Sequence, residues 1–301
     1  MTVKKKGLFI RARVIHFIRQ FFIDKDYLEI ETPNLIPAPA PEVHIDAIKA
    51  GNSYLHTSPE LYMKRLLCAG YPNIFQISKC YRDEERGNSH LPEFTLLEWY
   101  HTGIDYFRLM KECEELILFV AGELGFGETI KYLDKTIYLR RPWESISVSE
   151  AFKRYSGLSV NRALSSGSFD EIMVEEIEPK LPMDRPVFIY DYPASLAALA
   201  RLKESDPQWA ERFELYIGGL ELANAFSELT DVPEQAERFT RENINRELLG
   251  KEKYPLPVKF LEELHLMPEN AGIALGIDRL VMLFANASKI DDVVAFTPEE
   301  L

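Results

Sequence analysis

Residues 75–100 read FQISKCYRDEERGNSHLPEFTLLEWY, and this stretch decides the fold. The segments 73–82 and 93–100 are typical of strands, and the polar residues 83–92 between them are typical of a loop. Alternation along each strand puts Arg82 on one face of the first, and Phe94, Glu98 and Tyr100 on one face of the second. If these faces coincide, we expect one pocket floor to carry an arginine, an aromatic ring and a carboxylate.

Glu98 is the unusual residue of these two strands because it lies among Leu97, Trp99 and other apolar residues. An unpaired buried carboxylate is costly, so a cation should meet it. Two interpretations stay open, namely a lysine or arginine of the protein, which is the commoner arrangement, or a cationic ligand. His90 in the intervening loop is compatible with a phosphate contact and is weak evidence alone.

Farther along the chain, the strand patterns 212–217 and 220–226 surround two glycines, a hairpin signal. A two-residue turn would pair Tyr216 with Glu221 and Leu215 with Leu222, and would place Glu214 on the face of Glu221. Two neighbouring carboxylates favour a hard divalent cation between them, and Mg²⁺ carrying a nucleotide fits. The alternative is a pair of solvated surface glutamates.

The second strand of this hairpin also carries Asn224, Phe226 and Glu228 in alternation. Simple counting puts these three residues on the face opposite Glu221. All of them can line one pocket only if the strand contains a bulge, which we predict near Ala223.

The segment 272–279 reads GIALGIDR, a strand of small residues that Arg279 closes before an apolar helix at 280–285. A lone arginine there is most simply a surface charge. The glycines at 272 and 276, however, indicate that backbone or ligand comes close, and a planar guanidinium can stack on a base while it pairs with phosphate.

The remaining chain completes a mainly antiparallel α+β domain, which we expect to span residues 1–301 without a linker. Apolar spacing predicts helices at 8–22 and 104–122, and alternation predicts a strand at 27–32 that ends before Pro33. The sequence TSPE at 57–60 opens a short helix that ends at Gly70. Residues 142–207 are a mixed segment whose elements the sequence does not order.

Composition excludes several classes of protein. The chain has 301 residues, with 48 Asp and Glu against 35 Lys and Arg and a net charge of −13, which disfavours a broad nucleic-acid surface. Three cysteines without a paired spacing support neither a disulfide framework nor a zinc ribbon. The sequence contains no apolar run long enough for a membrane span and no signal-peptide core at its N-terminus. We therefore expect a cytoplasmic protein with no membrane partner.

Together these segments resemble the catalytic core of class II aminoacyl-tRNA synthetases, and specifically the lysyl branch. Residues 8–33 resemble motif 1, residues 75–100 resemble motif 2, and residues 272–279 resemble motif 3. The sequences ELANAFSELT at 221–230 and TSPE at 57–60 narrow the resemblance to lysine-type substrates. The fold implied is a central, mainly antiparallel sheet flanked by helices.

Three departures from lysyl-tRNA synthetases are features of the elongation factor P–lysine ligases, which attach (R)-β-lysine to a lysine of that factor. The motif 1 helix begins near residue 8, which leaves no room for an anticodon-binding barrel. The segment 47–56 is shorter than the substrate-covering loop of the synthetases, and Ala274 stands where they have glycine. The resemblance therefore implies ATP-dependent ligation of β-lysine, supplied by a lysine aminomutase, to elongation factor P by a homodimer without stable tRNA binding.

The resemblance also implies residue roles. Arg82 and Arg279 would be catalytic, Arg82 holding the α-phosphate and the substrate carboxylate. Phe94 and Arg279 would sandwich the adenine, Glu84 would lie near it, and His90 would touch the terminal phosphates. Glu214 and Glu221 would hold Mg²⁺. The substrate site would comprise residues for the side-chain ammonium (Glu98, Tyr100 and Glu228), the other amino group (Glu60) and the carboxylate (Asn224), together with Phe226 and Ala274.

Two rival interpretations stay open at this stage. A lysyl-tRNA synthetase catalytic domain would make the same adenylate and charge tRNA instead. A catalytically inactive regulatory paralogue is disfavoured because such proteins usually lose the arginines of motifs 2 and 3, and Arg82 and Arg279 are present.

Overall fold

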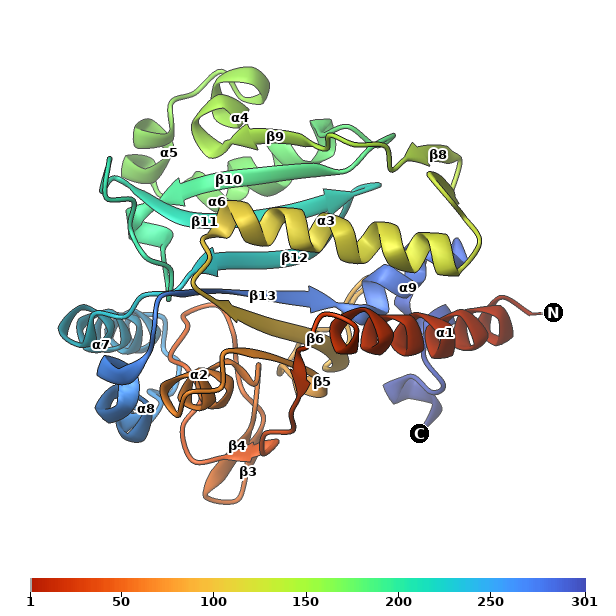
Figure 1. The fold of residues 1–301 in the computed structure, drawn as a ribbon. Coiled ribbons are helices and arrows are strands. Elements are labelled where there is room, and N and C mark those ends of the chain that lie inside the picture. The colour runs from red at the N-terminus through yellow and green to blue at the C-terminus, as the bar shows by residue number, and fades with distance from the viewer. Residues whose placement is uncertain (1) are drawn as a thin grey trace.

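The computed structural model describes residues 2–301 and is organised around an eight-stranded sheet (Figure 1). The strand order is β1-β5-β6-β13-β12-β11-β10-β9; the pairs β1–β5 and β9–β10 are parallel, and the other neighbours are antiparallel. The strands are β1 (Leu28–Glu29), β5 (Asn73–Tyr81), β6 (Glu93–Thr102), β9 (Glu144–Ser147), β10 (Val187–Pro193), β11 (Trp209–Ile217), β12 (Leu220–Ser227) and β13 (Asn270–Gly276). The predicted α+β fold with a mainly antiparallel sheet is confirmed.

Two small sheets lie outside this platform. One has the order β2-β4-β3 and the other pairs β7 with β8. Their strands are β2 (Leu35–Ile36), β3 (Lys49–Ala50), β4 (Ser53–Leu55), β7 (Thr129–Tyr132) and β8 (Lys135–Tyr138).

Three groups of helices cover the large sheet. The main hydrophobic core joins the sheet to α1 (Val3–Ile23), α3 (Tyr106–Glu123) and α9 (Ile277–Ala285), and Figure 1 shows α1 and α3 running across the sheet. A second core packs α4 (Val148–Tyr155), α5 (Val160–Ser166) and α6 (Phe169–Ile172) beside β9 and β10. A third contains residues of α2 (Glu60–Cys68), α7 (Val232–Leu248) and α8 (Val258–Glu263). The helices leave part of β6, β12 and β13 uncovered, and the pocket described below lies there.

Most elements predicted from sequence are present, and two differ. The strand expected at 27–32 contains only Leu28 and Glu29, because β1 pairs with one end of β5 and the chain then leaves the sheet towards β2. The strand that carries motif 3 ends at Gly276, so Arg279 lies in the first turn of α9. The mixed segment 142–207 resolves into β9, the short helices α4, α5 and α6, a π-helical turn at Met173–Ile177, 3₁₀ turns at Glu178–Lys180 and Ala194–Leu196, and β10.

The β11–β12 hairpin confirms the predicted bulge and corrects one pairing. Tyr216 pairs with Glu221 as expected, but Leu215 pairs with Ala223, and the register shifts between these two pairs. Leu222 is thus the extra residue of the bulged strand. The turn itself uses Gly218 and Gly219 at φ values of 61° and 81°, a left-handed conformation that two consecutive glycines adopt without strain.

No helix formed by residues 2–301 combines the length and the apolar character needed to cross a membrane.

Candidate active site

One pocket lies over β6, β12 and β13 and collects twelve of the fourteen predicted site residues: Glu60, Arg82, His90, Phe94, Glu98, Tyr100, Glu221, Asn224, Phe226, Glu228, Ala274 and Arg279. The pairing of Gln76 with Glu98 and of Cys80 with Phe94 places the two predicted strand faces side by side. The bulge at Leu222 brings Glu221 to the face of Asn224, because Glu214 pairs with Asn224 and Tyr216 with Glu221. Glu84 is exposed and does not line the pocket. Glu214 is buried and does not line it either.

The deep end of the pocket is built around Glu98. Its side chain accepts hydrogen bonds from Ser58 Oγ at 2.6 Å and from Tyr100 OH at 3.2 Å. Burial, and next the negative charge of Glu60, raise the pKa of Glu98 to about 8. Among residues 2–301 this carboxylate has no ion-pair partner, although a cation was expected to meet it. A bound ammonium group is the interpretation that this arrangement favours.

Glu228 is the second carboxylate at this end. Its Oε2 forms an ion pair with Lys64 Nζ at 2.5 Å, and its Oε1 has no hydrogen-bond donor within the described chain. Burial raises the pKa of Glu228 to about 8, and the charge of Lys64 only partly opposes this effect. Glu228 therefore retains the capacity to accept hydrogen bonds from a ligand.

Lys64 joins two acidic residues of the pocket. Its ammonium group contacts Glu60, one helical turn earlier, as well as Glu228. Burial acts to lower the pKa of Lys64, but the charges of Glu228 and Glu60 outweigh it and raise that pKa. Lys64 thus stays charged and neutralises part of the acidic cluster, including Glu60, the residue expected to bind the substrate's other amino group.

The floor of the pocket depends on two small residues of β13. Gly272 pairs with Tyr100 on one side and with Phe226 on the other, and a Cβ atom there would lie 2.3 Å from Tyr100 Cε1 and 2.5 Å from Glu228 Oε1. Ala274 lies between Glu98 and Asn224 in the sheet register. Gly272 therefore makes room for the acidic cluster, while the methyl group of Ala274 occupies the centre of the floor.

The other end of the pocket is basic. The guanidinium of Arg82 lies 5.0 Å from the centroid of the Phe94 ring, and its Nε is buried with no partner in the described chain. Its closest acidic neighbour, Glu85, is 3.7 Å away. Arg82 is consequently available to an anionic ligand.

Arg279 connects three segments at this end. It donates to the Glu221 carbonyl oxygen at 2.7 Å and lies 3.2 Å from Glu221 Oε2, and it also donates to Ser89 O and His90 Nε2. Partial desolvation and the charge of Arg279 lower the pKa of His90, which keeps the imidazole neutral and able to accept this bond. Motif 3, the hairpin and the motif 2 loop thus converge at one guanidinium.

The carboxylates predicted to hold magnesium have different surroundings. Glu214 accepts hydrogen bonds from Arg212 Nη2 at 2.7 Å, Tyr192 OH at 2.6 Å and Tyr216 OH at 2.7 Å. Partial desolvation and then the charge of Glu214 raise the pKa of Glu221, although its side chain is still 38% exposed. Within residues 2–301 no group of three candidate metal ligands occurs. Mg²⁺ is commonly held by one or two carboxylates together with substrate phosphates, so the oxygen donors present fit a nucleotide-bound ion.

Sequence reasoning missed Lys64 and Arg212. Lys64 follows Glu60 at i+4 on a helix, a spacing that signals a possible ion pair, but only the tertiary structure adds Glu228. Arg212 shares a strand face with Glu214 by alternation, and its Nε donates to Asn224 Oδ1 at 3.1 Å.

This geometry defines a class of protein, namely enzymes that join a cationic amino acid to a nucleotide phosphate. The antiparallel sheet places an acidic subsite for the amino acid beside two arginines that suit the phosphate. A family model described as tRNA synthetases class II (D, K and N) matches residues 2–300. The chain is 40% identical to an elongation factor P–(R)-β-lysine ligase of Hamiltonella defensa, over 97% of this chain and 95% of the relative. It is 38% identical to the protein of that name from Proteus mirabilis, over 96% and 94% of the two chains. The chain therefore belongs to the class II tRNA synthetase family and, within it, to the elongation factor P–(R)-β-lysine ligases.

Proposed function

We propose that this enzyme activates (R)-β-lysine with ATP and transfers it to a lysine side chain of translation elongation factor P. The relatives' names support the substrate and the acceptor, and the family implies ATP-dependent amino-acid ligation. The observation that carries the proposal is the pair of buried carboxylates, Glu98 and Glu228, which lack a full set of protein partners at one end of a pocket that has Arg82 at the other.

In the first step, an oxygen of the β-lysine carboxylate attacks the α-phosphorus of ATP. The bond from this phosphorus to the bridging oxygen of the β-phosphate breaks, and pyrophosphate leaves. Arg82 holds the carboxylate and the α-phosphate together, which removes much of the entropic cost of aligning two reactants and offsets their mutual repulsion. Glu98, Tyr100 and Glu228 fix the distant ammonium group of the substrate.

The nucleotide occupies the basic end. Arg279 and Phe94 hold the adenine, Arg279 also reaches the γ-phosphate, and neutral His90 contacts the terminal phosphates. Glu84 approaches the adenine only if the motif 2 loop moves, because its side chain is exposed outside the pocket. Glu221, supported by Glu214, would hold Mg²⁺, and the ion would neutralise phosphate charge when bound.

In the second step, the uncharged amine of the acceptor lysine attacks the carbonyl carbon of the adenylate. An amide bond forms, AMP leaves, and the amine loses a proton. Asn224 orients the reacting carboxyl group, and Phe226 and Ala274 shape the wall against which the substrate backbone packs.

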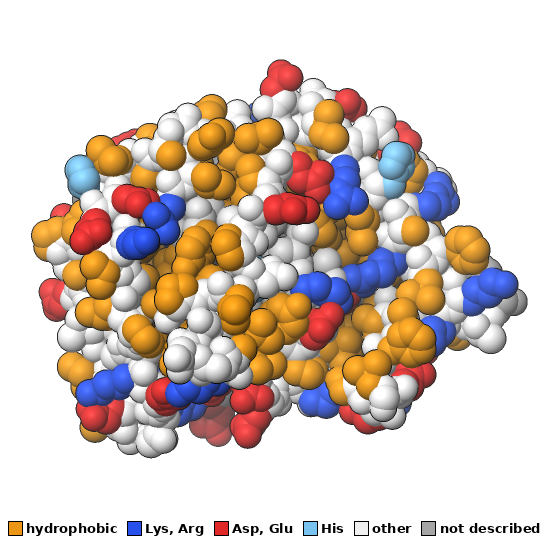
Figure 2. All heavy atoms as spheres, turned by 90° about the horizontal axis from the view of Figure 1, so that it is seen from below, with side chains coloured by type: hydrophobic (Ala, Val, Ile, Leu, Met, Phe, Trp, Pro, Cys, Tyr) orange, Lys and Arg blue, Asp and Glu red, His pale blue; other side chains and the backbone are white. Residues whose placement is uncertain are grey.

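The proposal extends to the assembly. Residues 1–301 act as one catalytic domain, and the enzyme works in the cytoplasm on β-lysine made by a lysine aminomutase, without stable tRNA binding. Basic and acidic side chains stand among hydrophobic ones on the face in Figure 2, so this face presents no continuous basic surface. Two copies associate through α1 and β1; Phe9, which is 61% exposed, and the edge position of β1 support this arrangement.

The test follows the mass of each acceptor. The enzyme is incubated with ATP, Mg²⁺ and β-lysine together with either elongation factor P or tRNA(Lys), and intact mass and acid-stable charging are measured. We expect a mass gain of one β-lysyl group on the protein only. Charging of tRNA without a mass gain on the protein would instead identify a lysyl-tRNA synthetase, and absence of ATP–pyrophosphate exchange with any lysine isomer would identify an inactive paralogue. Sedimentation of a monomer at micromolar concentration would exclude the dimer.

A further inference from the structure

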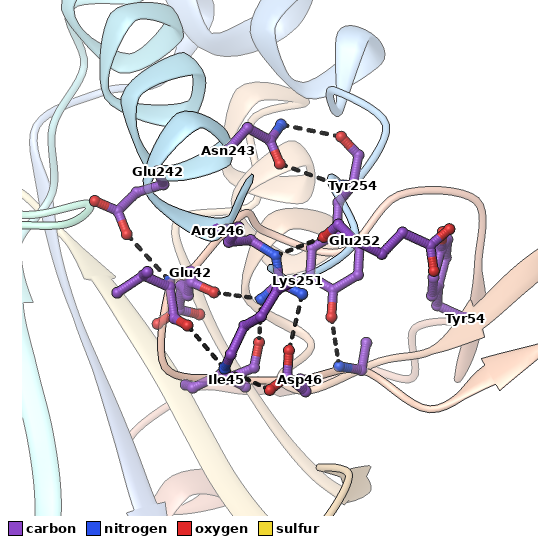
Figure 3. Close-up of polar contacts among 12 residues, drawn as sticks. Glu42, Ile45, Asp46, Tyr54, Glu242, Asn243, Arg246, Lys251, Glu252 and Tyr254 are labelled. Carbon is purple, nitrogen blue, oxygen red and sulfur yellow. Dashed lines mark hydrogen bonds and ion pairs between the residues drawn. The ribbon is translucent and has the colours of Figure 1, made fainter. Parts of the chain in front are cut away.

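One wall of the pocket is a strap, residues 42–47, which no predicted site residue belongs to. Glu42 and Ile45 of the strap line the pocket. Apart from Asp83, the contacts that hold the strap come from its outer side, where α7 ends and residues 251–254 turn back (Figure 3).

Arg246 is the centre of this attachment. Its side chain is only 2% exposed and donates to Glu42 O at 2.8 Å, Ile45 O at 3.0 Å and Asp46 Oδ1 at 2.8 Å. Its guanidinium also lies 3.9 Å from the centroid of the Tyr254 ring. A buried guanidinium with this many acceptors fixes the backbone of the strap in one geometry.

Further bonds complete the attachment. Lys251 Nζ donates to Val43 O at 3.0 Å and to Asp46 Oδ2 at 2.6 Å, and Val43 N donates to Glu242 Oε2 at 3.1 Å. On the other side, Asp83 N donates to Asp46 O at 2.7 Å. Because Asp83 directly follows Arg82, the strap is held in register with the arginine expected to bind the reacting carboxylate.

The side chain of Glu42 takes no part in this network. Within residues 2–301 its carboxylate has neither an ion-pair partner nor a hydrogen-bond donor, although it borders the pocket. Burial, and then the charge of Glu60, raise the pKa of Glu42 to about 7, and the next charges acting on it are those of Arg82 and Arg212. Glu42 lines the same pocket as Glu60 and Arg82, so its carboxylate borders the space in which these residues are expected to bind the substrate.

A diamino acid brings two ammonium groups into the pocket. Glu98 and the unpartnered oxygen of Glu228 can accept hydrogen bonds from one of them. Lys64 contacts both Glu60 and Glu228, so part of the charge of Glu60 is already compensated. Glu42 is a further carboxylate of the pocket that has no ion-pair partner among residues 2–301, and a second ammonium group would supply one.

We propose that Glu42 and Glu60 together bind the ammonium group that the substrate carries near its reacting carboxylate, and that Glu42 thereby selects amino acids with a second amino group. This inference rests on the proposed function and adds a specificity residue to it. The strap acts as the support that presets the position of Glu42.

The test removes the carboxylate and the amino group separately. The Glu42→Gln variant is compared with the wild type for the KM of β-lysine in ATP–pyrophosphate exchange and for the Ki of 6-aminohexanoate, which is β-lysine without its 3-amino group. We expect the KM of β-lysine to rise about tenfold or more, the scale of a lost hydrogen bond to a charged group. The Ki of 6-aminohexanoate and the KM of ATP should change by less than about twofold, since neither ligand presents the amino group to Glu42.

Two further variants serve as controls for the role of the Glu42 carboxylate. Glu42→Asp keeps the charge and should restore part of the affinity for β-lysine. Glu252→Gln makes the same change at a 55% exposed carboxylate on the outer side of the strap, paired with Lys49, and should leave both amino-acid constants unchanged. Three results would overturn the inference: in Glu42→Gln, affinity falls equally for β-lysine and 6-aminohexanoate, or it falls for neither; or Glu252→Gln shows the same selective loss. In each case exchange by the wild type would still support the proposed function. A wild type that activates no diamino acid would remove both.

Discussion

Replacing Gly272 by alanine should disable the acidic end of the pocket. The added Cβ would lie 2.3 Å from Tyr100 Cε1 and 2.5 Å from Glu228 Oε1. To restore ordinary van der Waals contact, the Tyr100 ring would have to retreat by about 1 Å. This ring is only 3% exposed and donates to Glu98, so it cannot move without disturbing two of the groups expected to bind the substrate ammonium.

Overpacking of this kind typically costs about 1–3 kcal/mol, and we expect the loss to appear in substrate binding as well as in folding. The KM of β-lysine in ATP–pyrophosphate exchange should rise about tenfold or more, the equivalent of about 1.4 kcal/mol, while the KM of ATP changes much less. Thermal unfolding measures the loss of stability in the same preparation.

Gly276→Ala is the matched control for stability. It adds the same methyl group to the same strand, but the nearest atom that the methyl would meet, Arg279 Cδ, is 3.8 Å away. Its melting temperature should stay close to that of the wild type. A Gly272→Ala enzyme with an unchanged KM for β-lysine would refute the argument that Tyr100 and Glu228 form the ammonium site.

Three further predictions concern the same pocket. Ala274→Gly should improve activation of α-lysine relative to β-lysine by about 1–3 kcal/mol, and an unchanged ratio of kcat/KM values would remove Ala274 as a specificity residue. The pKa values of Glu98 and Glu228 are raised from 4.5 to about 8, so the stability that these groups give the free enzyme is complete below about pH 4.5 and is lost as the pH rises through about 8. Because an ammonium ligand needs their ionised forms, β-lysine should release protons on binding near pH 7, and calorimetry in buffers of different ionisation enthalpy that detects no release would contradict this assignment. Lys64→Met should destabilise the protein by about 3–5 kcal/mol at about pH 9, above the raised pKa of Glu228, since it removes the cation that contacts Glu228 and Glu60; a loss below about 1 kcal/mol in denaturant unfolding at that pH would contradict this pairing.

Local patterns in the sequence were sufficient to predict the central antiparallel sheet and the order of the motifs along the chain. Alternation is a property of the strand itself, so it placed Phe94, Glu98 and Tyr100 on one face before any partner strand was known. The two glycines of the hairpin turn and the mismatch between Glu221 and Asn224 required a bulge, which the structure has at Leu222. Here chain geometry left few alternatives.

Contacts between distant segments were decided by the tertiary structure alone. Lys64 meets Glu228 across 164 positions of the chain, and Arg246 holds Glu42 from the end of α7. The start of α9 at Ile277 and the short β1 likewise depended on what packs beside them. Side-chain periodicity specifies which face a residue occupies, but the charge that compensates a buried carboxylate is chosen by whichever segment folds against it, and the local sequence carries no record of that choice.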